Sequence, residues 1–320
     1  MTSKVAVVGC GYWGKNLVRN FAKLGALGAI VDSRPETASA LAAEHGAPAL
    51  SFDDALASTQ IDGVAIAAPA EFHARLALRA LAAGKHIFIE KPMALTIADA
   101  EQVTRAAEAA GRVLMIGHLL QYHPAFETLL ALVKSGELGG LSSAYSHRLS
   151  LGKTRIEENV LWSFAPHDIS MLLALFDETP TEVMGFGSAI LTPGVEDEYR
   201  LDLGFADGRR AHAFASWIHP FKEHRLVVTC AKGMAVFEDS APQGEKLRVY
   251  RHSFDMTRRP PEPRKGEVEL LSYPNDEPLQ QECAHFIACI RTGNRPRTDG
   301  AEGLRVLEVL TRVSAAATKL

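Results

Sequence analysis

The chain has 320 residues, of which 47% are hydrophobic and 22% are charged, and its formal net charge is -4. This length and composition are typical of a globular protein large enough for two domains. This slight negative net charge gives no positive electrostatic potential of the kind that attracts nucleic acids or anionic membranes. Neither is therefore expected as a partner. No apolar run approaches the roughly 20 residues that cross a bilayer, and the first residues read as a strand rather than a leader. We therefore expect a cytoplasmic protein.

The cysteines and histidines show no metal-binding pattern. Cys10, Cys230, Cys283 and Cys289 form no CxxC pair, and the histidines lack HExxH spacing and a cysteine at a useful distance. We expect four reduced thiols and no metal site.

The first 120 residues alternate short apolar runs with amphipathic helical segments. The expected strands cover 4–9, 27–32, 62–68, 85–90 and 112–118, and the expected helices cover 13–24, 36–44, 71–83 and 97–110. Continuous apolar strands separated by helices predict a parallel sheet covered on both faces. The sequence thus predicts an α/β protein whose residues 1–120 form a doubly wound Rossmann domain.

After "HPAFETLLALVKSGELGG" (123–140), an expected helix closed by Gly136, Gly139 and Gly140, the sequence changes to alternating polar and apolar stretches. They cover 142–151, 181–190, 198–208, 209–218, 224–233 and 233–239, several joined by Asp-Gly or Lys-Gly turns. This pattern predicts an α+β domain over 121–320 with an open, mostly antiparallel sheet. Helices are expected over 166–176, 279–291 and 300–317, and the last could pack on either domain. The segment 239–274 is expected to be a loop or an edge hairpin.

A glycine motif follows the first expected strand. "VAVVGCGYWG" places Gly9, Gly11 and Gly14 in a GxGxxG pattern, which allows a tight turn, close approach of a pyrophosphate and close packing of helix on strand. The next strand ends in Asp32, which would bind the adenosine ribose hydroxyls and repel a 2'-phosphate, so NAD is favoured over NADP. Arg34 could instead bind that phosphate, but we favour a solvated loop charge because Asp32 would remain in the way. The alternative for the glycines is a structural turn that binds nothing.

The stretch "FIEKPMAL" places Glu90, Lys91 and Pro92 at the end of another strand. Ligands of a doubly wound sheet bind beyond the carboxyl ends of its strands, which is the edge that holds the glycine loop. Lys91 is therefore expected near the nicotinamide end of the cofactor, with Pro92 restraining its backbone. The alternative is a surface Lys-Glu pair at a strand end.

These motifs together resemble the Gfo/Idh/MocA oxidoreductases over essentially the whole chain: the GxGxxG loop, "AAPAEFH" at 67–73, "EKP" at 90–92 and "HDI" at 167–169. The resemblance implies that Lys91 is catalytic beside the nicotinamide, that the bond to Pro92 is cis, and that His167 faces the reacting carbon. The implied cofactor contacts are Gly9, Gly11, Tyr12, Trp13, Gly14, Asp32, Ser33, Arg34, Ala68, Pro69, His73, Glu90, Lys91 and Pro92.

The sequence departs from the family pattern near the histidine. Many members have an aspartate four residues before it, whereas "WSFAPHDIS" has Ser163 there. A simple aspartate-assisted base is therefore not expected, and we assign proton transfer jointly to Lys91 and His167. Asp168 is expected to cap or orient the helix. The alternative for His167 is a helix histidine packed at a domain interface.

Two stretches are expected to bind substrate, 117–126 and 145–168. The first offers Gln121, Tyr122 and His123, and the second concentrates cations suited to a diphosphate, although either could be an ordinary charged strand and loop. The predicted substrate-binding residues are Lys91, Tyr122, His123, Arg148, Arg155, Asn159, Trp162, Ser163 and His167.

Read together, "GHLLQYHPAF" and "RIEENVLWSFAPHDIS" resemble the branch of the family that acts on UDP-linked amino sugars at C3, which includes UDP-N-acetylglucosamine 3-dehydrogenases. The resemblance implies NAD-dependent formation of a 3-keto sugar for a PLP-dependent aminotransferase in lipid A (lipopolysaccharide) or surface polysaccharide synthesis. Alternatives are the uronic acid substrate, a ketosugar reductase, a free-sugar or inositol dehydrogenase, and a non-catalytic NAD-binding sensor. Exposed sheet faces in the second domain predict a homodimer or homotetramer.

Overall fold

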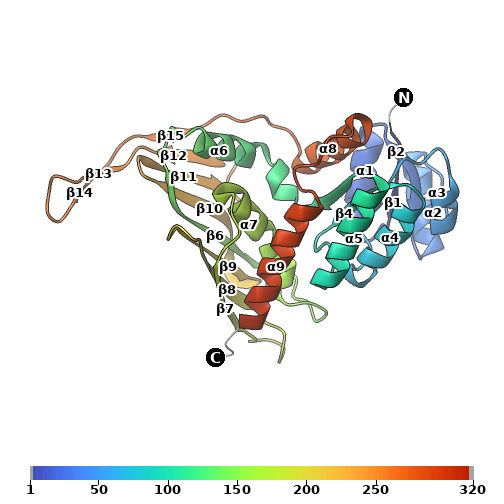
Figure 1. Ribbon diagram of the computed structural model, residues 1–320, viewed down its shortest axis with the longest axis horizontal. Helices are drawn as coiled ribbons and strands as arrows, with labels where there is room; N and C mark the ends of the chain where they lie inside the picture. Colours follow the sequence, from blue (N-terminus) through green and yellow to red (C-terminus); the bar gives the residue numbers. More distant parts are fainter. Residues whose placement is uncertain (1–2, 317–320) are drawn as a thin grey trace. The chain divides into compact units, whose positions relative to one another are not determined.

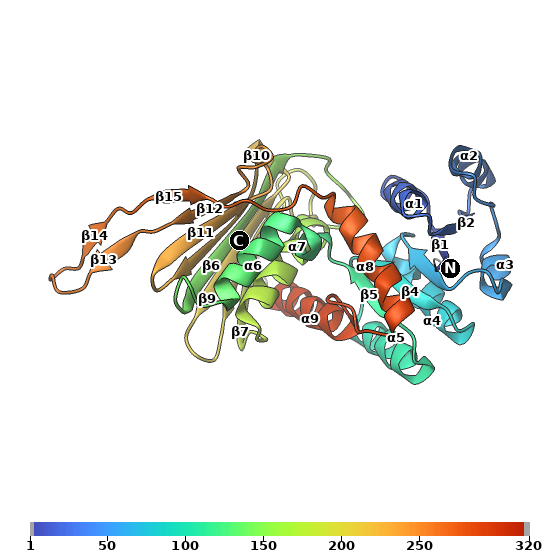
Figure 2. The same ribbon diagram turned by 90° about the horizontal axis from the view of Figure 1, so that it is seen from above.

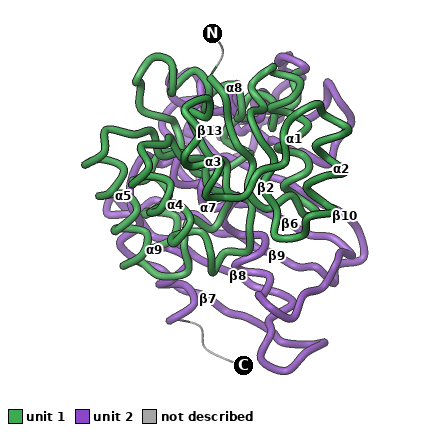
Figure 3. Tube along the Cα trace, turned by 90° about the vertical axis from the view of Figure 1, so that its right-hand side faces the viewer, with its two compact units in different colours: residues 1–122, 276–307 green, residues 123–275, 308–320 purple. Residues whose placement is uncertain are grey.

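The computed structural model describes residues 3–316, which form two compact units (Figures 1 and 3). Unit 1 comprises the residues up to 122 together with 276–307. Unit 2 comprises residues 123–275 together with the residues from 308 onward. Each unit thus consists of two segments of the chain, and each has its own sheet.

Unit 1 is built on a five-stranded parallel sheet in the order β2-β1-β3-β4-β5. The strands are β1 (Val5–Val8), β2 (Leu27–Val31), β3 (Gly63–Ile66), β4 (His86–Glu90) and β5 (Leu114–Gly117). The helices between them are α1 (Gly14–Lys23), α2 (Pro35–His45), α3 (Phe52–Ala57), η1 (Ala70–Phe72), α4 (His73–Ala82) and α5 (Ile97–Ala110), and η2 (Leu119–Tyr122) follows β5. All five expected strands are confirmed, and the short α3 is an addition. The fold of this unit is the predicted Rossmann type.

Helix α8 (Pro278–Thr292) belongs to unit 1, although the predicted second domain of residues 121–320 contained it. The ring of Phe286 packs edge-on against Phe88 of β4 at 5.8 Å and against Phe21 of α1 at 6.4 Å. These rings are buried in one apolar cluster with residues of α1 and the sheet. Figure 2 shows α8 beside β4 and β5. Apolar burial of this size places the helix on the Rossmann sheet.

Helix α9 (Gly300–Ala316) begins in unit 1 and ends in unit 2. In its first turn a Cβ at Gly303 would lie 2.7 Å from a side-chain carbon of Ile116, so the glycine permits close packing there. Near its end the Tyr199 hydroxyl donates to the Val313 carbonyl at 3.2 Å, and Arg312 donates to the Pro180 carbonyl at 2.7 Å. The expectation that this helix packs on one domain or the other is replaced by packing on both.

Unit 2 is built on an eight-stranded sheet in the order β15-β12-β11-β10-β6-β9-β8-β7. The strands are β6 (Leu141–Leu151), β7 (Glu182–Ser188), β8 (Glu198–Gly204), β9 (Arg210–Ser216), β10 (Ile218–Cys230), β11 (Gly233–Glu238), β12 (Leu247–Tyr250) and β15 (Val268–Leu270). All neighbouring pairs are antiparallel except β6 and β9. The mostly antiparallel sheet is therefore confirmed. The segment 239–274 supplies the edge strands β12 and β15 and a separate hairpin, β13 (Ser253–Asp255) with β14 (Glu262–Arg264).

One face of this sheet is covered and the other is open. Helices α6 (Pro124–Lys134) and α7 (Val160–Phe176) pack on the covered face, where Leu226 and Val228 are buried. Their neighbour Val227 points to the opposite face and is only half-buried, as is Tyr145, whose ring stacks on that of His212 at 5.2 Å. This alternation of buried and half-buried residues is typical of a sheet with one face left for another partner.

Helix α7 begins at Val160, six residues before the expected start at Pro166. The Asn159 side chain caps it by accepting a hydrogen bond from the Trp162 amide at 3.2 Å, and the helix continues through Pro166. One helix therefore carries Trp162, Ser163 and His167. Among the helices of residues 3–316, none has the length and apolar character needed to cross a membrane.

Candidate functional site

The glycine loop follows β1 and leads into α1. Gly9 has a φ of 84°, and a Cβ there would lie 2.5 Å from the Ala68 amide nitrogen. A Cβ at Gly14 would lie 1.9 Å from the Gly9 carbonyl oxygen, so both positions need glycine for packing. Around Gly11 a Cβ would meet no atom within 4 Å. The backbone at Gly11 is thus open to a ligand at the start of α1, as a pyrophosphate requires.

Asp32 lies directly after β2, beside this loop. Its carboxylate accepts hydrogen bonds from the Cys10 amide at 2.7 Å and the Arg34 amide at 2.9 Å, which fix its position. The Arg34 guanidinium lies 3.5 Å from the same carboxylate and its side chain is 61% exposed. This geometry suits an acid that binds ribose hydroxyls, with Ser33 next to it and the exposed Tyr12 across the loop. The individual contacts remain predictions.

The end of β4 is tied to the start of α1. The indole N–H of Trp13 donates to Glu90 at 2.5 Å, and a Cβ at Gly117 would lie 2.9 Å from the other Glu90 oxygen. Burial raises the pKa of Glu90 to about 7, while the hydrogen bond from Trp13 and the charge of Lys91 act in the opposite direction. Glu90 therefore lies within the sheet edge as an internal group.

His73 joins two of the motif segments. Its Nδ1 lies 2.8 Å from the Pro92 carbonyl oxygen and its Nε2 lies 2.7 Å from the Ala68 carbonyl oxygen. The side chain is buried, and burial lowers the pKa of His73. His73 thus connects the "AAPAEFH" and "EKP" segments from inside. Its contact with the cofactor stays a prediction. The Lys91–Pro92 bond is cis, as the resemblance implied, and Lys91 is partly buried.

The glycine loop, Asp32, the segment from Ala68 to Pro69 and the segment from Glu90 to Pro92 all follow the carboxyl ends of strands in one parallel sheet. Carboxyl ends of parallel strands share an edge, so the structure gathers the predicted cofactor residues as expected. These residues fit NAD: open backbone for the pyrophosphate and a fixed carboxylate for the ribose.

In unit 2, Asp168, the residue after His167, is held by side-chain hydrogen bonds. Arg148 on β6 donates to both carboxylate oxygens of Asp168, at 2.6 and 3.1 Å, and Ser146 donates to one of them at 2.5 Å. All three are buried. The expected orienting role of Asp168 fits this geometry. Arg148 forms a buried ion pair with Asp168, which balances its charge. Its binding of substrate stays a prediction.

Three other predicted substrate residues have structural roles. Tyr122 is buried in unit 1 with its hydroxyl 3.0 Å from that of Thr298. His123 is buried in unit 2, where its Nδ1 accepts from the Ala125 amide at 3.1 Å and so caps α6. Asn159 caps α7 and donates to Glu196 at 2.6 Å. The substrate roles of Tyr122, His123 and Asn159 stay predictions.

The remaining predicted substrate residues lie on α7 and the loop before it. Trp162 donates to the Ser314 hydroxyl at 3.2 Å, Ser163 is buried, and Arg155 pairs with Glu158 in an exposed loop. His167 is partly exposed. The substrate roles of these residues remain predictions.

A buried polar network in unit 1 was not predicted. The Nδ1 atom of His118 lies 2.6 Å from Glu302, and Gln121 donates to the other Glu302 oxygen at 2.8 Å. Gln121, expected to face a sugar, is thus held inside the unit. Glu302 lies on α9, more than 180 residues away in sequence, and no local pattern connects it to the end of β5.

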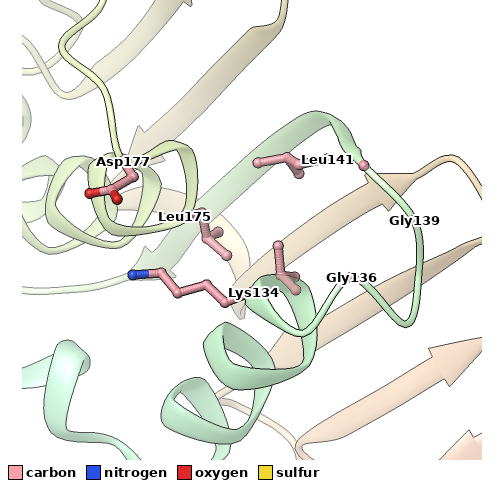
Figure 4. A pocket seen from close by; sticks show the side chains of 8 residues that line it. Lys134, Gly136, Gly139, Leu141, Leu175 and Asp177 are labelled. Atoms are coloured by element: carbon pink, nitrogen blue, oxygen red, sulfur yellow. The ribbon is translucent and has the colours of Figure 1, made fainter.

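No cluster of three or more histidine, cysteine or acidic residues within 3–316 could hold a metal ion. All four cysteines are buried and free of disulfides. One open pocket of about 540 Å³ lies in unit 2 between the ends of α6 and α7, lined by Lys134, Leu141, Leu175 and Asp177 among others (Figure 4). It contains none of the predicted site residues.

Comparisons with known proteins agree with these features. Residues 3–118 match the model of an oxidoreductase family with an NAD-binding Rossmann fold, and residues 126–236 match the GFO/IDH/MocA C-terminal domain. A UDP-N-acetylglucosamine 3-dehydrogenase from Acidithiobacillus ferrooxidans is 27% identical over 319 residues, which cover 98% of this chain and 96% of the relative. An inositol 2-dehydrogenase from Paracoccus denitrificans is 31% identical over 175 residues, about half of each chain.

Solved structures lead to the same grouping. The structure of the Acidithiobacillus ferrooxidans UDP-N-acetylglucosamine 3-dehydrogenase has a TM-score of 0.88 and 25% identity, covering 99% of this chain and 98% of that one. The likeness therefore includes both sheets, and the Rossmann part is of the NAD-binding kind. On its motifs, its fold and both domain matches, the chain belongs to the GFO/IDH/MocA oxidoreductase family.

Proposed function

We propose that this protein oxidises the C3 hydroxyl of a UDP-linked amino sugar, UDP-N-acetylglucosamine or a close relative, to the 3-keto sugar with NAD. The observation that carries the proposal is the likeness to the Acidithiobacillus ferrooxidans enzyme over nearly the whole of both chains, in sequence and in fold. Inositol dehydrogenases are the second candidate class: the Paracoccus denitrificans enzyme matches about half of the chain, and an inositol 2-dehydrogenase from Rhizobium meliloti is 26% identical over 293 residues, 87% of this chain. The longer match to the Acidithiobacillus ferrooxidans enzyme, 98% of this chain, favours a substrate of its class.

The residues of unit 1 suit the cofactor part of this reaction. The open backbone at Gly11 and the start of α1 bind the pyrophosphate, and the fixed Asp32 carboxylate binds the ribose and opposes a 2'-phosphate. When held by these residues, NAD would supply the acceptor for a hydride from the sugar carbon. The "EKP" segment lies at the same sheet edge, where Glu90 and His73 hold the backbone on both sides of Lys91.

Loss of the hydride requires that the hydroxyl proton also leaves. We assign its transfer and the orientation of the hydroxyl jointly to Lys91 and His167. The hydrogen-bonded ion pair between Arg148 and Asp168 fixes the turn of α7 that carries His167. The imidazole of His167 is therefore held on a rigid element. The Ser163 hydroxyl stands where many relatives have an aspartate, so we assign no carboxylate partner to His167 at that position.

The 3-keto product is suited to a PLP-dependent aminotransferase, which would install an amine at C3 for lipid A or another surface polysaccharide. We further propose that the open sheet face of unit 2 pairs between copies of the chain, since a half-exposed apolar sheet face is costly to leave in water.

The test is NADH formation at neutral pH by the purified protein with NAD and a panel of substrates. The panel contains UDP-N-acetylglucosamine, its uronic acid, UDP-glucose, free sugars and inositols, with and without a coupled aminotransferase that removes the 3-keto product. A signal confined to one UDP-amino sugar is expected. A signal with inositols or free sugars would replace the proposed substrate by that of the inositol dehydrogenases. Silence across the panel with NAD bound would favour a ketosugar reductase or a non-catalytic sensor.

A further inference from the structure

Glu282 on α8 is a buried acid that the proposed reaction does not use. Its side chain has no exposed surface, and neither carboxyl oxygen has a hydrogen-bond partner among the residues that the structure describes. An ionised carboxylate in such a place would be strongly destabilising, whereas a neutral carboxylic acid is tolerated. Buried polar groups in native proteins are nearly always hydrogen-bonded, so a buried carboxyl group without such partners calls for a physical reason.

The packing of α8 on β4 brings Glu282 toward Glu90. The two elements meet at Phe286 and Phe88, whose rings are 5.8 Å apart. Residues four apart lie on one face of a helix, and residues two apart lie on one face of a strand. Glu282 is therefore on the face of α8 that carries Phe286, and Glu90 is on the face of β4 that carries Phe88. The two acids also interact electrostatically.

Within residues 3–316, no cationic side chain is an electrostatic partner of Glu282. Its electrostatic neighbours are Glu90, the Tyr122 hydroxyl and the Cys283 thiol. Glu90 itself is approached by the Trp13 indole, by Lys91 and by His118. Burial and, at a greater distance, the charge of Glu277 raise the pKa of the Cys283 thiol. The Arg297 guanidinium lies 4.9 Å from the centre of the Tyr122 ring. Burial and the charge of Glu90 both raise the pKa of Glu282 well above the ordinary value.

We propose that Glu282 is a positioning residue for the "EKP" segment: its carboxyl group lies behind Glu90 and keeps its proton near neutral pH, so that Glu90 is the acid of the pair that bears the negative charge next to Lys91. Two carboxyl groups in one buried site cannot both ionise readily, so the ionisation of Glu90 postpones that of Glu282. The functional consequence rests on the proposed NAD site. A negative Glu90 near the nicotinamide would favour the cationic NAD over NADH.

The first test uses the protein without cofactor, with Trp13 as the reporter because its indole donates to Glu90. The pH dependence of the Trp13 signal is the fluorescence of the wild-type protein minus that of Trp13→Phe. A single transition near neutral pH is expected, and Glu90→Gln should abolish it. Glu282→Gln is neutral, as the protonated acid is, and should leave the midpoint within about 0.3 pH unit of the wild-type value. A midpoint lowered by about one pH unit or more in Glu282→Gln, a tenfold change in proton affinity, would mean that Glu282 is ionised while Glu90 titrates and would overturn the proposal.

A second measurement follows the melting temperature against pH. A glutamate with a raised pKa in the folded state contributes stability that is present below its ordinary pKa of 4.5 and lost as the pH rises toward the raised pKa. The Gln side chain of Glu282→Gln cannot ionise. The melting temperature of this variant minus that of the wild type should therefore increase between about pH 5 and pH 8. A constant difference would contradict the inference.

Glu282→Met is a second neutral variant of similar size. Failure of both neutral variants to fold would also count against the proposal, because a neutral acid should tolerate such a replacement. Both readouts are independent of substrate and cofactor. If the proposed dehydrogenase activity is absent, the titration of Glu90 still decides this inference.

Discussion

The indole N–H of Trp13 donates a hydrogen bond to the carboxyl group of Glu90, which lies 77 residues further along the chain. This contact joins the residue that precedes α1 to the last residue of β4. Glu90 is buried, so removal of the Trp13 indole would leave a buried carboxyl oxygen without its hydrogen-bond donor. We expect Trp13→Phe to lower the free energy of unfolding by about 1–2 kcal/mol, measured by urea denaturation.

Trp162→Phe is the matched control for this substitution. Its indole N–H also donates a hydrogen bond, but to the neutral Ser314 hydroxyl in a more exposed place. Its loss should cost under about 1 kcal/mol, because hydrogen bonds to ionised groups are the stronger ones. If both substitutions lowered the free energy of unfolding equally, the hydrogen bond to Glu90 would contribute no more stability than the one to the Ser314 hydroxyl.

His73 provides a pH-dependent prediction. Burial is the largest influence on its pKa and lowers it from 6.5, so the folded protein should hold the imidazole neutral. The stability that His73 contributes is then present above about pH 6.5 and lost as the pH falls through the lowered pKa. The melting temperature of the wild type minus that of His73→Gln should therefore shrink from about pH 7.5 to about pH 5. A growing difference would indicate an imidazolium that donates to both the Ala68 and Pro92 carbonyls.

Lys91 is the residue on which the proposed chemistry depends most. Lys91→Ala should reduce kcat by about 10²–10⁴-fold and leave the Kd for NAD within a few-fold, because the pyrophosphate and ribose contacts lie elsewhere. Lys91→Arg keeps the positive charge but cannot release a proton near neutral pH, so it should remain nearly as inactive. Initial rates with the best substrate and calorimetric titration of NAD check both points. Near-normal turnover of Lys91→Arg would leave Lys91 only an electrostatic role.

Asp32 should decide the choice between NAD and NADP. Its carboxylate is fixed by the Cys10 and Arg34 amides, so Asp32→Asn keeps the shape but removes the charge that repels a 2'-phosphate. The NAD-to-NADP ratio of kcat/KM should fall at least about tenfold. Arg34→Ala in the Asp32→Asn background should restore part of that ratio if the guanidinium then binds the phosphate. A ratio unchanged by Asp32→Asn would remove the ribose assignment.

The Rossmann strands could be predicted closely because a parallel sheet covered on both faces needs nearly continuous apolar strands, and such runs stand out in a sequence. Val5–Val8 and Gly63–Ile66 are buried along their whole length. The six alternating stretches of unit 2 were equally visible, because an open sheet face exposes every second residue. The assignment of α8 was different. Its pattern shows that one face is buried, but not that Phe286 packs on the first sheet.

The site was predictable where the motif is local and not where partners are distant. The glycine loop, Asp32 and the "EKP" segment each follow a strand, so their shared edge follows from topology. The sequence places Arg148 among cations suited to a diphosphate, because it displays the charge but not the buried partner Asp168 on another element. Likewise Glu282 is an ordinary acid in an amphipathic pattern. Only the packing of α8 on β4 shows its proximity to Glu90.

The open sheet face of unit 2 gives a prediction about assembly. Val227 of β10 lies opposite Tyr145 of β6 and Val236 of β11, and all three are half-buried on the face that α6 and α7 leave uncovered. Self-association across this face would bury it, so the wild-type protein should sediment as a dimer or tetramer. Val227→Glu adds a charge at the centre and should shift the protein toward monomer in sedimentation velocity runs.

Leu95→Glu is the matched control, because Leu95 is 49% exposed but belongs to unit 1. This substitution places the same new charge on a surface that the proposal leaves free, so the sedimentation coefficient should stay at the wild-type value. Circular dichroism of both variants checks that the fold is kept. A wild-type monomer at micromolar concentration, or an oligomer that survives Val227→Glu but not Leu95→Glu, would mean that the open face of unit 2 is not the contact between copies.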